Sequence, residues 1–188
     1  MTTFLAGLLF ASTLAAQAPD PARMQVIWEA FDDRMNTQTD IWFDDGEFPR
    51  VIQAVRVMYA LYPNDYEIAT NLGWMLENIE LDEAAIEIYR DYARNNPKDP
   101  DATYPEAQYY YREKQYEKVP DLLEPAIKMD PKPHPNAFRT LAHSYERLGK
   151  LEDSRRVWQA MIKLHPDDEP AKNNLRRVEG KIKAGGGG

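Results

Sequence analysis

The chain has 188 residues, of which 43% are hydrophobic and 29% are charged, a composition typical of one folded domain with a core. Its 23 Lys and Arg residues against 31 Asp and Glu residues give a formal net charge of −8, which would repel the phosphates of DNA or RNA. The absence of Cys from the sequence excludes disulfides, thiolate zinc sites, a cysteine nucleophile and a cysteine lipid anchor.

Residues 1–18 have the order of a secretory signal, an apolar run followed by small residues. The run covers 13 residues, 4–16, whereas a helix that spans a bilayer needs about 20. No Lys or Arg precedes it. A cut after Ala18 would place Pro19 at the scissile bond, and a cut after Ala16 avoids this. We therefore predict export to the periplasm or the extracellular space, without an integral membrane span. The alternatives are an apolar tail and an uncleaved anchor.

Residues 19–31 are predicted to form an N-terminal cap. Between residues 22 and 44, apolar side chains recur at the spacing of one helix face. They are Met24, Ile27, Trp28, Phe31, Met35 and Trp42. This pattern predicts a long or broken helix at the front of the folded part, with a boundary near the segment MNTQTD.

Prolines divide the next part of the chain at a nearly constant interval. Pro63, Pro97 and Pro131 are 34 residues apart, and Pro166 follows after 35. Each ends a stretch with a helical pattern, and the extra residue falls in the Pro-rich linker PKPHP, where an insertion is tolerated. A fixed period of this length is typical of stacked helical repeats. It predicts four units: 32–65, 66–99, 100–133 and 135–168.

Within this frame the residues resemble the tetratricopeptide repeat family, whose pattern has a bulky residue at position 4, Leu-Gly at 7 and 8, Tyr at 11, Ala at 20, an aromatic residue at 24 and Pro at 32. The second unit matches at Leu72, Gly73, Ala85, Tyr89 and Pro97. The fourth unit matches at Phe138, Leu141, Ala142, Tyr145, Gly149, Ser154, Trp158 and Pro166. The third unit keeps Ala107, Tyr110, Tyr116 and Pro131, but has Val119 and Leu123 at positions 20 and 24. The first keeps only Trp42, Gly46 and Pro63.

The spacing has a packing reason. Small residues at positions 8 and 20 let the two helices of a unit approach closely, and the large residues fill the space around their crossing. One such pair cannot bury its apolar face alone, so units stack. The resemblance implies an all-α fold, a right-handed solenoid of helical hairpins over residues 32–168, with a capping helix at each end.

The third unit departs from the pattern through three prolines. Pro105 is tolerated if its helix starts late, because Thr103 and Glu106 have the spacing of a capping box that places this proline in the first turn. Pro120 is predicted to open the second helix in the same way. Pro125 should kink that helix, since it removes a hydrogen bond from the interior. The result is either a hinge with a widened groove or a locally irregular repeat.

Residues 169–183 are predicted to form a C-terminal capping helix. Leu175, Val178 and Ile182 give it a narrow apolar stripe, and basic residues surround this stripe. The Gly-rich tail, residues 184–188, is expected to be disordered.

No residue pattern indicates catalysis. His134, His143 and His165 lie in different sequence contexts, with no spacing that would place two on one metal ion. The segment DDGE, residues 44–47, lacks the alternating oxygen ligands of a calcium loop. We therefore predict that the protein is not an enzyme and that it uses no cofactor and no metal.

The resemblance implies a binding site instead. In tetratricopeptide arrays, ligand peptides lie in a concave groove lined by the first helix of each unit. Carried over to this sequence, the groove residues are Asn71, Trp74, Asn78, Tyr104, Gln108, Tyr111, Arg112, Arg139, His143, Arg147, Asn174 and Arg177. Such side chains can hydrogen-bond an extended peptide and supply aromatic anchors. The alternative interpretation is that they are ordinary exposed residues.

One subfamily of these arrays does not fit this sequence. Arrays that bind the C-terminal carboxylate of heat-shock chaperones need a set of groove residues of which only Asn71 is present here.

Charge is distributed unevenly along the chain. Through residue 99 there are 7 basic and 17 acidic residues, whereas the remainder has 16 and 14. A bound ligand should therefore place acidic residues toward the C-terminal units and apolar anchors near Trp74, Tyr104 and Tyr111.

The sequence predicts a non-catalytic scaffold or adaptor that binds a peptide or partner protein and no nucleic acid. The alternative is a structural, self-associating component of an envelope assembly that uses its convex face or its end caps.

Overall fold

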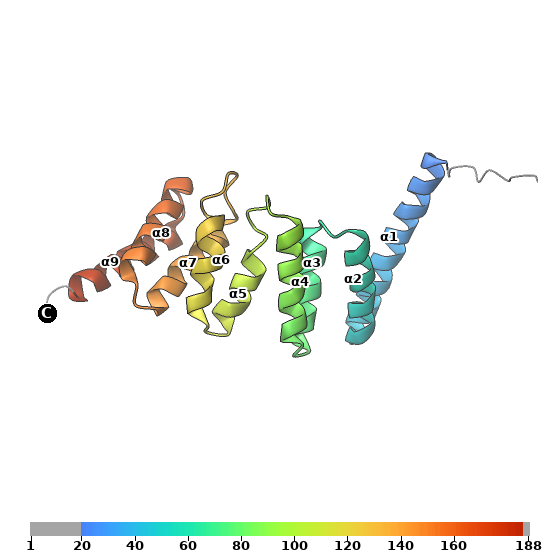
Figure 1. Ribbon diagram of the computed structural model, residues 1–188, viewed down its shortest axis with the longest axis horizontal. Coiled ribbons are helices and arrows are strands. Elements are labelled where there is room, and N and C mark those ends of the chain that lie inside the picture. The colour runs from blue at the N-terminus through green and yellow to red at the C-terminus, as the bar shows by residue number, and fades with distance from the viewer. Residues whose placement is uncertain (1–19, 186–188) are drawn as a thin grey trace, which may run out of the picture.

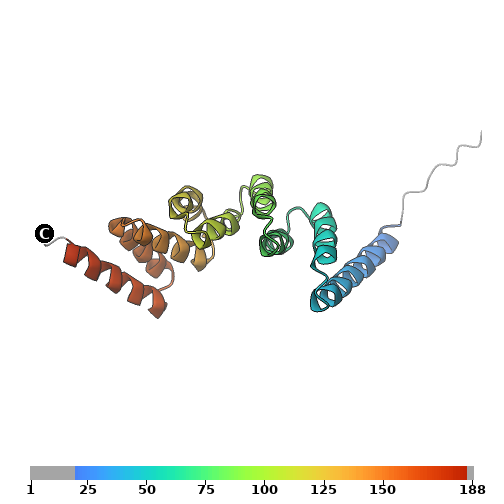
Figure 2. The same cartoon turned by 90° about the horizontal axis from the view of Figure 1, so that it is seen from below.

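A computed structural model describes residues 20–185 of the chain; the predicted signal in residues 1–18 and the last residues, 186–188, lie outside the described part. Within residues 20–185 every regular element is helical. Figure 1 shows these helices as one row, with α1 and α9 at opposite ends, and the turned view of Figure 2 shows the same order. Each helix packs on its neighbours along the chain. The prediction of an all-α solenoid is confirmed.

Four helical hairpins and a final helix make up the row. The first hairpin is α1 (Pro21–Asp44) with α2 (Phe48–Leu61), and the second is α3 (Tyr66–Asn78) with α4 (Asp82–Asn95). The third consists of α5 (Tyr104–Arg112), a 3₁₀ turn η1 (Tyr116–Lys118) and α6 (Val119–Ala126). The fourth is α7 (Pro135–Arg147) with α8 (Leu151–Leu164), and α9 (Glu169–Gly185) follows it.

The crossing of α3 and α4 depends on one glycine. A β-carbon at Gly73 would overlap the ring of Tyr89, so only glycine lets the two helices lie this close. Ala85, on the facing helix, is completely buried. In the fourth hairpin the corresponding crossing buries Ala142 and Trp158 completely. The small residues predicted at these positions therefore have the packing role that the repeat pattern assigned to them.

Every hairpin turns at a residue with a left-handed backbone conformation. These residues are Gly46, Glu80, Lys114 and Gly149, with φ between 60° and 75°. One residue further on, a backbone N–H donates to the carbonyl oxygen five residues earlier, at 2.8–2.9 Å, in all four hairpins. This is the Schellman motif, which satisfies the last carbonyls of a helix and favours glycine. Two of the four positions carry a side chain in a conformation that costs it free energy.

The third hairpin starts late, as predicted, with Pro105 in the first turn of α5. The predicted capping box is wrong. The Thr103 hydroxyl donates to the carbonyl oxygen of Leu122, 3.0 Å away, and the Glu106 carboxylate accepts from Arg90 instead. These two contacts join α5 to α6 and to α4, because the side chains that would have closed the cap reach neighbouring helices.

The second helix of this hairpin is short. α6 has 8 residues, whereas α2, α4 and α8 each have 14. Pro120 lies in its first turn, as predicted. Pro125, where a kink was predicted, lies inside α6, and the helix ends one residue after it. The irregular third repeat is therefore a shortened hairpin.

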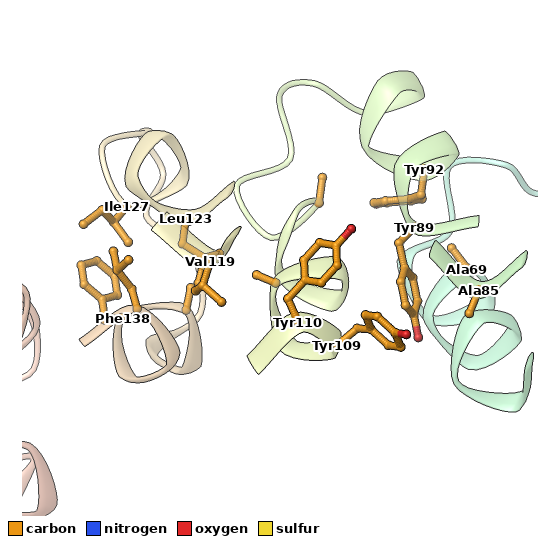
Figure 3. Close-up of a cluster of buried hydrophobic side chains, with 14 of the residues drawn as sticks. Ala69, Ala85, Tyr89, Tyr92, Tyr109, Tyr110, Val119, Leu123, Ile127 and Phe138 are labelled. Atoms are coloured by element: carbon orange, nitrogen blue, oxygen red, sulfur yellow. The ribbon is translucent and has the colours of Figure 1, made fainter. Parts of the chain in front are cut away.

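Tyrosines fill much of the junction between the second and third hairpins. Figure 3 shows Tyr89 of α4 and Tyr109 and Tyr110 of α5 on facing sides of it. Their hydroxyls need partners, and that of Tyr110 accepts a hydrogen bond from Arg90 at 3.0 Å. The rings of Tyr109 and Tyr110 meet edge to face, with centroids 5.5 Å apart. This junction is therefore bridged by polar groups as well as by apolar contact.

The two ends of the row differ. At the front, α1 runs unbroken through the segment MNTQTD, so residues 21–31 belong to the same helix as the start of the first unit. This helix extends past α2 (Figure 1), and Val26, Ile27 and Trp28 remain exposed. At the other end, α9 packs on α8 and buries Ala171 and Val178. It continues through Gly185, so the first two residues assigned to the disordered tail are helical.

Candidate binding groove

Three hollows follow one another along the helices that begin each hairpin. The apolar hollow, of about 230 Å³, lies where α1 and α2 meet α3, and its lining residues are Phe43, Phe48, Trp74, Met75, Asn78 and Ile79. The tyrosine hollow, of about 260 Å³, lies mainly between α3 and α5, and is lined by Tyr66, Thr70, Asn71, Trp74, Tyr89, Tyr104, Pro105, Gln108 and Arg112. The basic hollow, of about 600 Å³, joins α5, α7 and α9, and is lined by Tyr111, His143, Glu146, Arg147, Arg177 and Lys181. We call the three together the groove.

The structure brings together most of the groove residues predicted from the sequence. Those in the tyrosine hollow are Asn71, Trp74, Tyr104, Gln108 and Arg112. Those in the basic hollow are Tyr111, His143, Arg147 and Arg177. Asn78 lines the apolar hollow, and Arg139 and Asn174 line none of the three. The predicted set thus follows the groove from α3 to α9.

Trp74 is the central aromatic residue of the groove. It lines both the apolar and the tyrosine hollow, and its side chain is 48% exposed. Large aromatic rings on an otherwise polar face are typical anchors for a bound partner. Beside it, the Asn78 amide donates to the carbonyl oxygen of Trp74 at 2.7 Å, which fixes the orientation of that amide.

Arg112 is held by the protein itself. Its guanidinium pairs with the Glu77 carboxylate, which also accepts a hydrogen bond from the Tyr89 hydroxyl at 2.6 Å. Burial, together with this carboxylate, raises the pKa of Tyr89 far above its ordinary value. Tyr89 is therefore a neutral donor, and Arg112 and Glu77 cancel each other's charge within the tyrosine hollow.

Arg139 fixes the last helix. It pairs with the carboxylate of Asp168 and donates to the side-chain oxygen of Asn136 at 2.8 Å. Asp168 in turn accepts the backbone N–H of Ala171 at 2.9 Å, which caps the start of α9. That backbone hydrogen bond and the guanidinium of Arg139 lower the pKa of Asp168. The contacts of Arg139 are therefore those of a structural residue.

Glu146 organises the basic hollow. Its carboxylate accepts hydrogen bonds from Arg177 at 2.8 Å and from Lys181 at 2.7 Å, and its side chain is only 10% exposed. Burial acts to raise the pKa of Glu146, but the hydrogen bonds from Arg177 and Lys181 outweigh it and hold the pKa at about 2. Glu146 is therefore ionised at neutral pH and joins α7 to α9.

His143 is the neutral member of the basic hollow. Burial lowers its pKa, and the carboxylate of Glu146, with an oxygen 3.7 Å from Nδ1, only partly opposes this. Its ring meets that of Trp158 edge to face, with centroids 5.0 Å apart. A histidine whose pKa lies below its ordinary value carries no charge at neutral pH.

Several lining residues were not in the predicted set. Phe48, Met75 and Ile79 come from the junction of the first two hairpins, where the degenerate first unit gives little guidance on register. Lys181 lies one helical turn beyond Arg177, so the helical spacing would have found it.

Among the described residues 20–185, the side chains form no cluster of three or more His, Cys, Asp or Glu residues that could hold a metal ion. Over the same range, no helix is both long and apolar enough to cross a membrane.

No family profile and no curated protein matches this sequence. Solved structures do match the fold. A crystal structure of MamA aligns with a TM-score of 0.59 at 22% identity over 76% of this chain and 78% of that one. A tetratricopeptide repeat protein from Parabacteroides merdae ATCC 43184 aligns with a TM-score of 0.57 at 15% identity over 79% of this chain and 58% of that one. The first TPR domain of human RPAP3 gives 0.54 at 19% identity over 62% and 91%. The chain has the tetratricopeptide repeat fold.

Proposed function

We propose that this protein is a non-catalytic scaffold that binds an extended segment of a partner protein in the groove. The observation that carries the proposal is the exposed ring of Trp74, which two hollows share. Around it, the tyrosine hollow offers the amides of Asn71 and Gln108, which can hydrogen-bond a peptide backbone. An aromatic anchor flanked by such amides suits a ligand without regular structure of its own.

The proposed location of the protein is the periplasm or the extracellular space, because residues 1–18 have an apolar run followed by small residues, as a secretory signal has. An exported scaffold would meet its partner outside the cytoplasm, so capture experiments belong in envelope or culture fractions of the native host.

Capture with the intact protein and two matched variants tests the proposal. Trp74→Ala removes the groove anchor, and Trp28→Ala removes a similarly exposed tryptophan from the free part of α1. Partner proteins recovered by the wild type and by Trp28→Ala, but lost with Trp74→Ala, support groove binding. Unchanged capture by the double variant Trp74→Ala, Tyr111→Ala would rule the groove out.

A specific observation favours a second function, self-association through the front of the array. Val26, Ile27 and Trp28 are exposed on α1. A nearly apolar depression lies between α1 and α2, formed by Met35, Trp42, Pro49, Arg50, Gln53, Ala54 and Val57. Terminal repeats normally carry a polar outer face. Sedimentation of the purified protein distinguishes the two functions, because an oligomer that Trp28→Ala dissociates supports this alternative.

A further inference from the structure

We propose that the basic hollow binds two neighbouring carboxylate side chains of the peptide that occupies the groove, an inference that rests on the proposed function. The hollow has three permanent cations, Arg147, Arg177 and Lys181, and one carboxylate, Glu146. It therefore retains two positive charges while the neutral His143 adds none. Tyr111 contributes a hydroxyl from the neighbouring hairpin.

The cations are already held in place before a ligand arrives. The buried carboxylate of Glu146 binds both Arg177 and Lys181, which fixes their side chains at the wall of the hollow. Each has donors beyond those that Glu146 uses, since a guanidinium has five N–H groups and an ammonium three. A preorganised pair of cations binds an anion with less loss of side-chain entropy.

Arg147 is the cation with no partner of its own. It is exposed at the end of α7, and within residues 20–185 no carboxylate lies at ion-pair distance from it. Unpaired positive charge beside an organised pair of cations attracts a ligand carboxylate that the protein does not itself supply.

The other two arginines predicted for the groove, Arg112 and Arg139, lack this surplus of positive charge. Arg112 faces Glu77, and Arg139 faces Asp168, each in a pair whose charges cancel. The basic hollow, between α5, α7 and α9, is therefore where acidic residues of a ligand gain the most binding free energy. The distribution of charge along the sequence predicted only that such residues lie toward the C-terminal units, and it did not show which of the four predicted arginines would bind them.

The size of the hollow favours two carboxylates over one phosphate. At about 600 Å³, with donors on three helices, it is broad, whereas a phosphate group is compact and brings its charge to one point near Glu146. Two acidic side chains can approach Arg147 and the Arg177–Lys181 pair separately. The overall charge of −8 argues against a polyanion such as nucleic acid as the source.

Selection from a phage-displayed library of random short peptides tests the inference with the intact protein. We expect the wild type to enrich peptides with neighbouring Asp or Glu residues together with an aromatic or aliphatic residue. The best peptide is then synthesised, and its affinity is measured for the wild type and two double variants. Arg147→Ala, Lys181→Ala removes two cations from the hollow, and Lys172→Ala, Arg176→Ala removes two cations of α9 that lie outside it.

The expected result is a loss of about tenfold or more in affinity for Arg147→Ala, Lys181→Ala and little change for the control variant. Both variants should retain the helical circular dichroism of the wild type, because Arg177 still holds Glu146. Selected peptides without acidic residues, or equal affinity for both variants, would overturn the inference. Tighter binding of a phosphoserine version of the peptide would overturn the choice of carboxylates.

The same selection distinguishes this inference from the function on which it rests. Peptides that depend on Trp74 but carry no acidic residues would leave groove binding intact and remove the acidic specificity. Acidic peptides that depend on Arg147 and Lys181 but not on Trp74 would support the basic hollow and contradict the central anchor. Failure to enrich any peptide on the wild type would overturn both.

Discussion

Gly73 lies against the ring of Tyr89 with no room for a β-carbon between them. Gly73→Leu should therefore push α3 and α4 apart and lower the free energy of unfolding by about 1–3 kcal/mol or more. In a chain of this size each kcal/mol corresponds to about 2–4 °C in melting temperature. Thermal denaturation followed by circular dichroism measures the change.

Glu80→Ala is the control for this substitution, because it changes an exposed turn and leaves the left-handed backbone occupied by a residue with a β-carbon. Its melting temperature should match that of the wild type. If the two variants lost equal stability, the assignment of Gly73 to the helix crossing would have to be abandoned.

The hairpin turns predict two stabilising substitutions. Glu80 and Lys114 have φ values of 61° and 60°, at positions where the first and fourth hairpins have glycine. Replacing either with glycine removes a backbone penalty of about 1 kcal/mol, so Glu80→Gly and Lys114→Gly should each raise the melting temperature. Chemical denaturation in urea gives the difference in free energy.

Gly149→Ala tests the same principle in reverse. A β-carbon there would contact nothing within 4 Å, so only the backbone conformation, with φ of 72°, opposes it. A loss of about 1 kcal/mol is expected. A stability equal to the wild type would mean that these turns are free of strain.

The architecture was accessible from the sequence because it depends on a period. A proline recurs every 34 or 35 residues, and the small residues at the helix crossings recur in the second and fourth units, so these hairpins support the assignment of the others. The third unit was harder, because Thr103 and Glu106 have a local capping pattern but make contacts with other helices. Local sequence could not show that competition.

The sequence predicts which faces of α3, α5 and α7 line the groove, since the register of these helices follows from the repeat frame. It does not predict which arginines form ion pairs within the protein. The partner of Arg112 lies 35 residues earlier, in the preceding unit, and the partner of Arg177 lies 31 residues earlier, in the fourth unit. The partner of Arg139 lies 29 residues later, directly before α9. Such pairs depend on how the hairpins stack, which no single unit specifies.

Two arginines on α7 should respond differently to charge reversal. Arg139→Glu places a carboxylate beside Asp168 and removes the contact that secures the start of α9, so it should cost about 1 kcal/mol or more in stability. Arg147→Glu breaks no ion pair within residues 20–185 and should leave the melting temperature unchanged, while slowing association with an acidic ligand and flattening its salt dependence. Equal melting temperatures for the two variants would contradict the structural role of Arg139.

Glu146 should make the docking of α9 sensitive to acid. Its folded-state pKa of about 2 lies below the ordinary 4.5, so its contribution is fully present above the unfolded pKa and is lost as pH falls from about 4.5 toward 2. Between pH 6 and pH 2 the wild type should lose more stability than Glu146→Gln, by up to about 3 kcal/mol. Parallel stability curves for the two proteins would show that the ion pairs contribute nothing.

Export remains a prediction from the order of residues 1–18, which lie outside the described structure. Expressed in a secreting host, the chain should begin at Gln17 or Pro19 after processing, because cuts after Ala16 and after Ala18 both fit the small residues there. Intact mass spectrometry of the secreted protein identifies the terminus. Recovery of the full-length chain from the soluble cytoplasm would contradict the prediction.

Because α1 is unbroken, it holds its N-terminal end at a distance from the stacked hairpins. At 24 residues this helix is about 36 Å long, and its first part stands clear of α2 (Figure 1). Asp20, to which the preceding segment is joined, is therefore carried at the tip of a rigid rod, beyond the end of the stacked hairpins. A tether or label attached through that segment is therefore held away from the groove by α1, and the groove helices α3, α5, α7 and α9 stay accessible to a ligand.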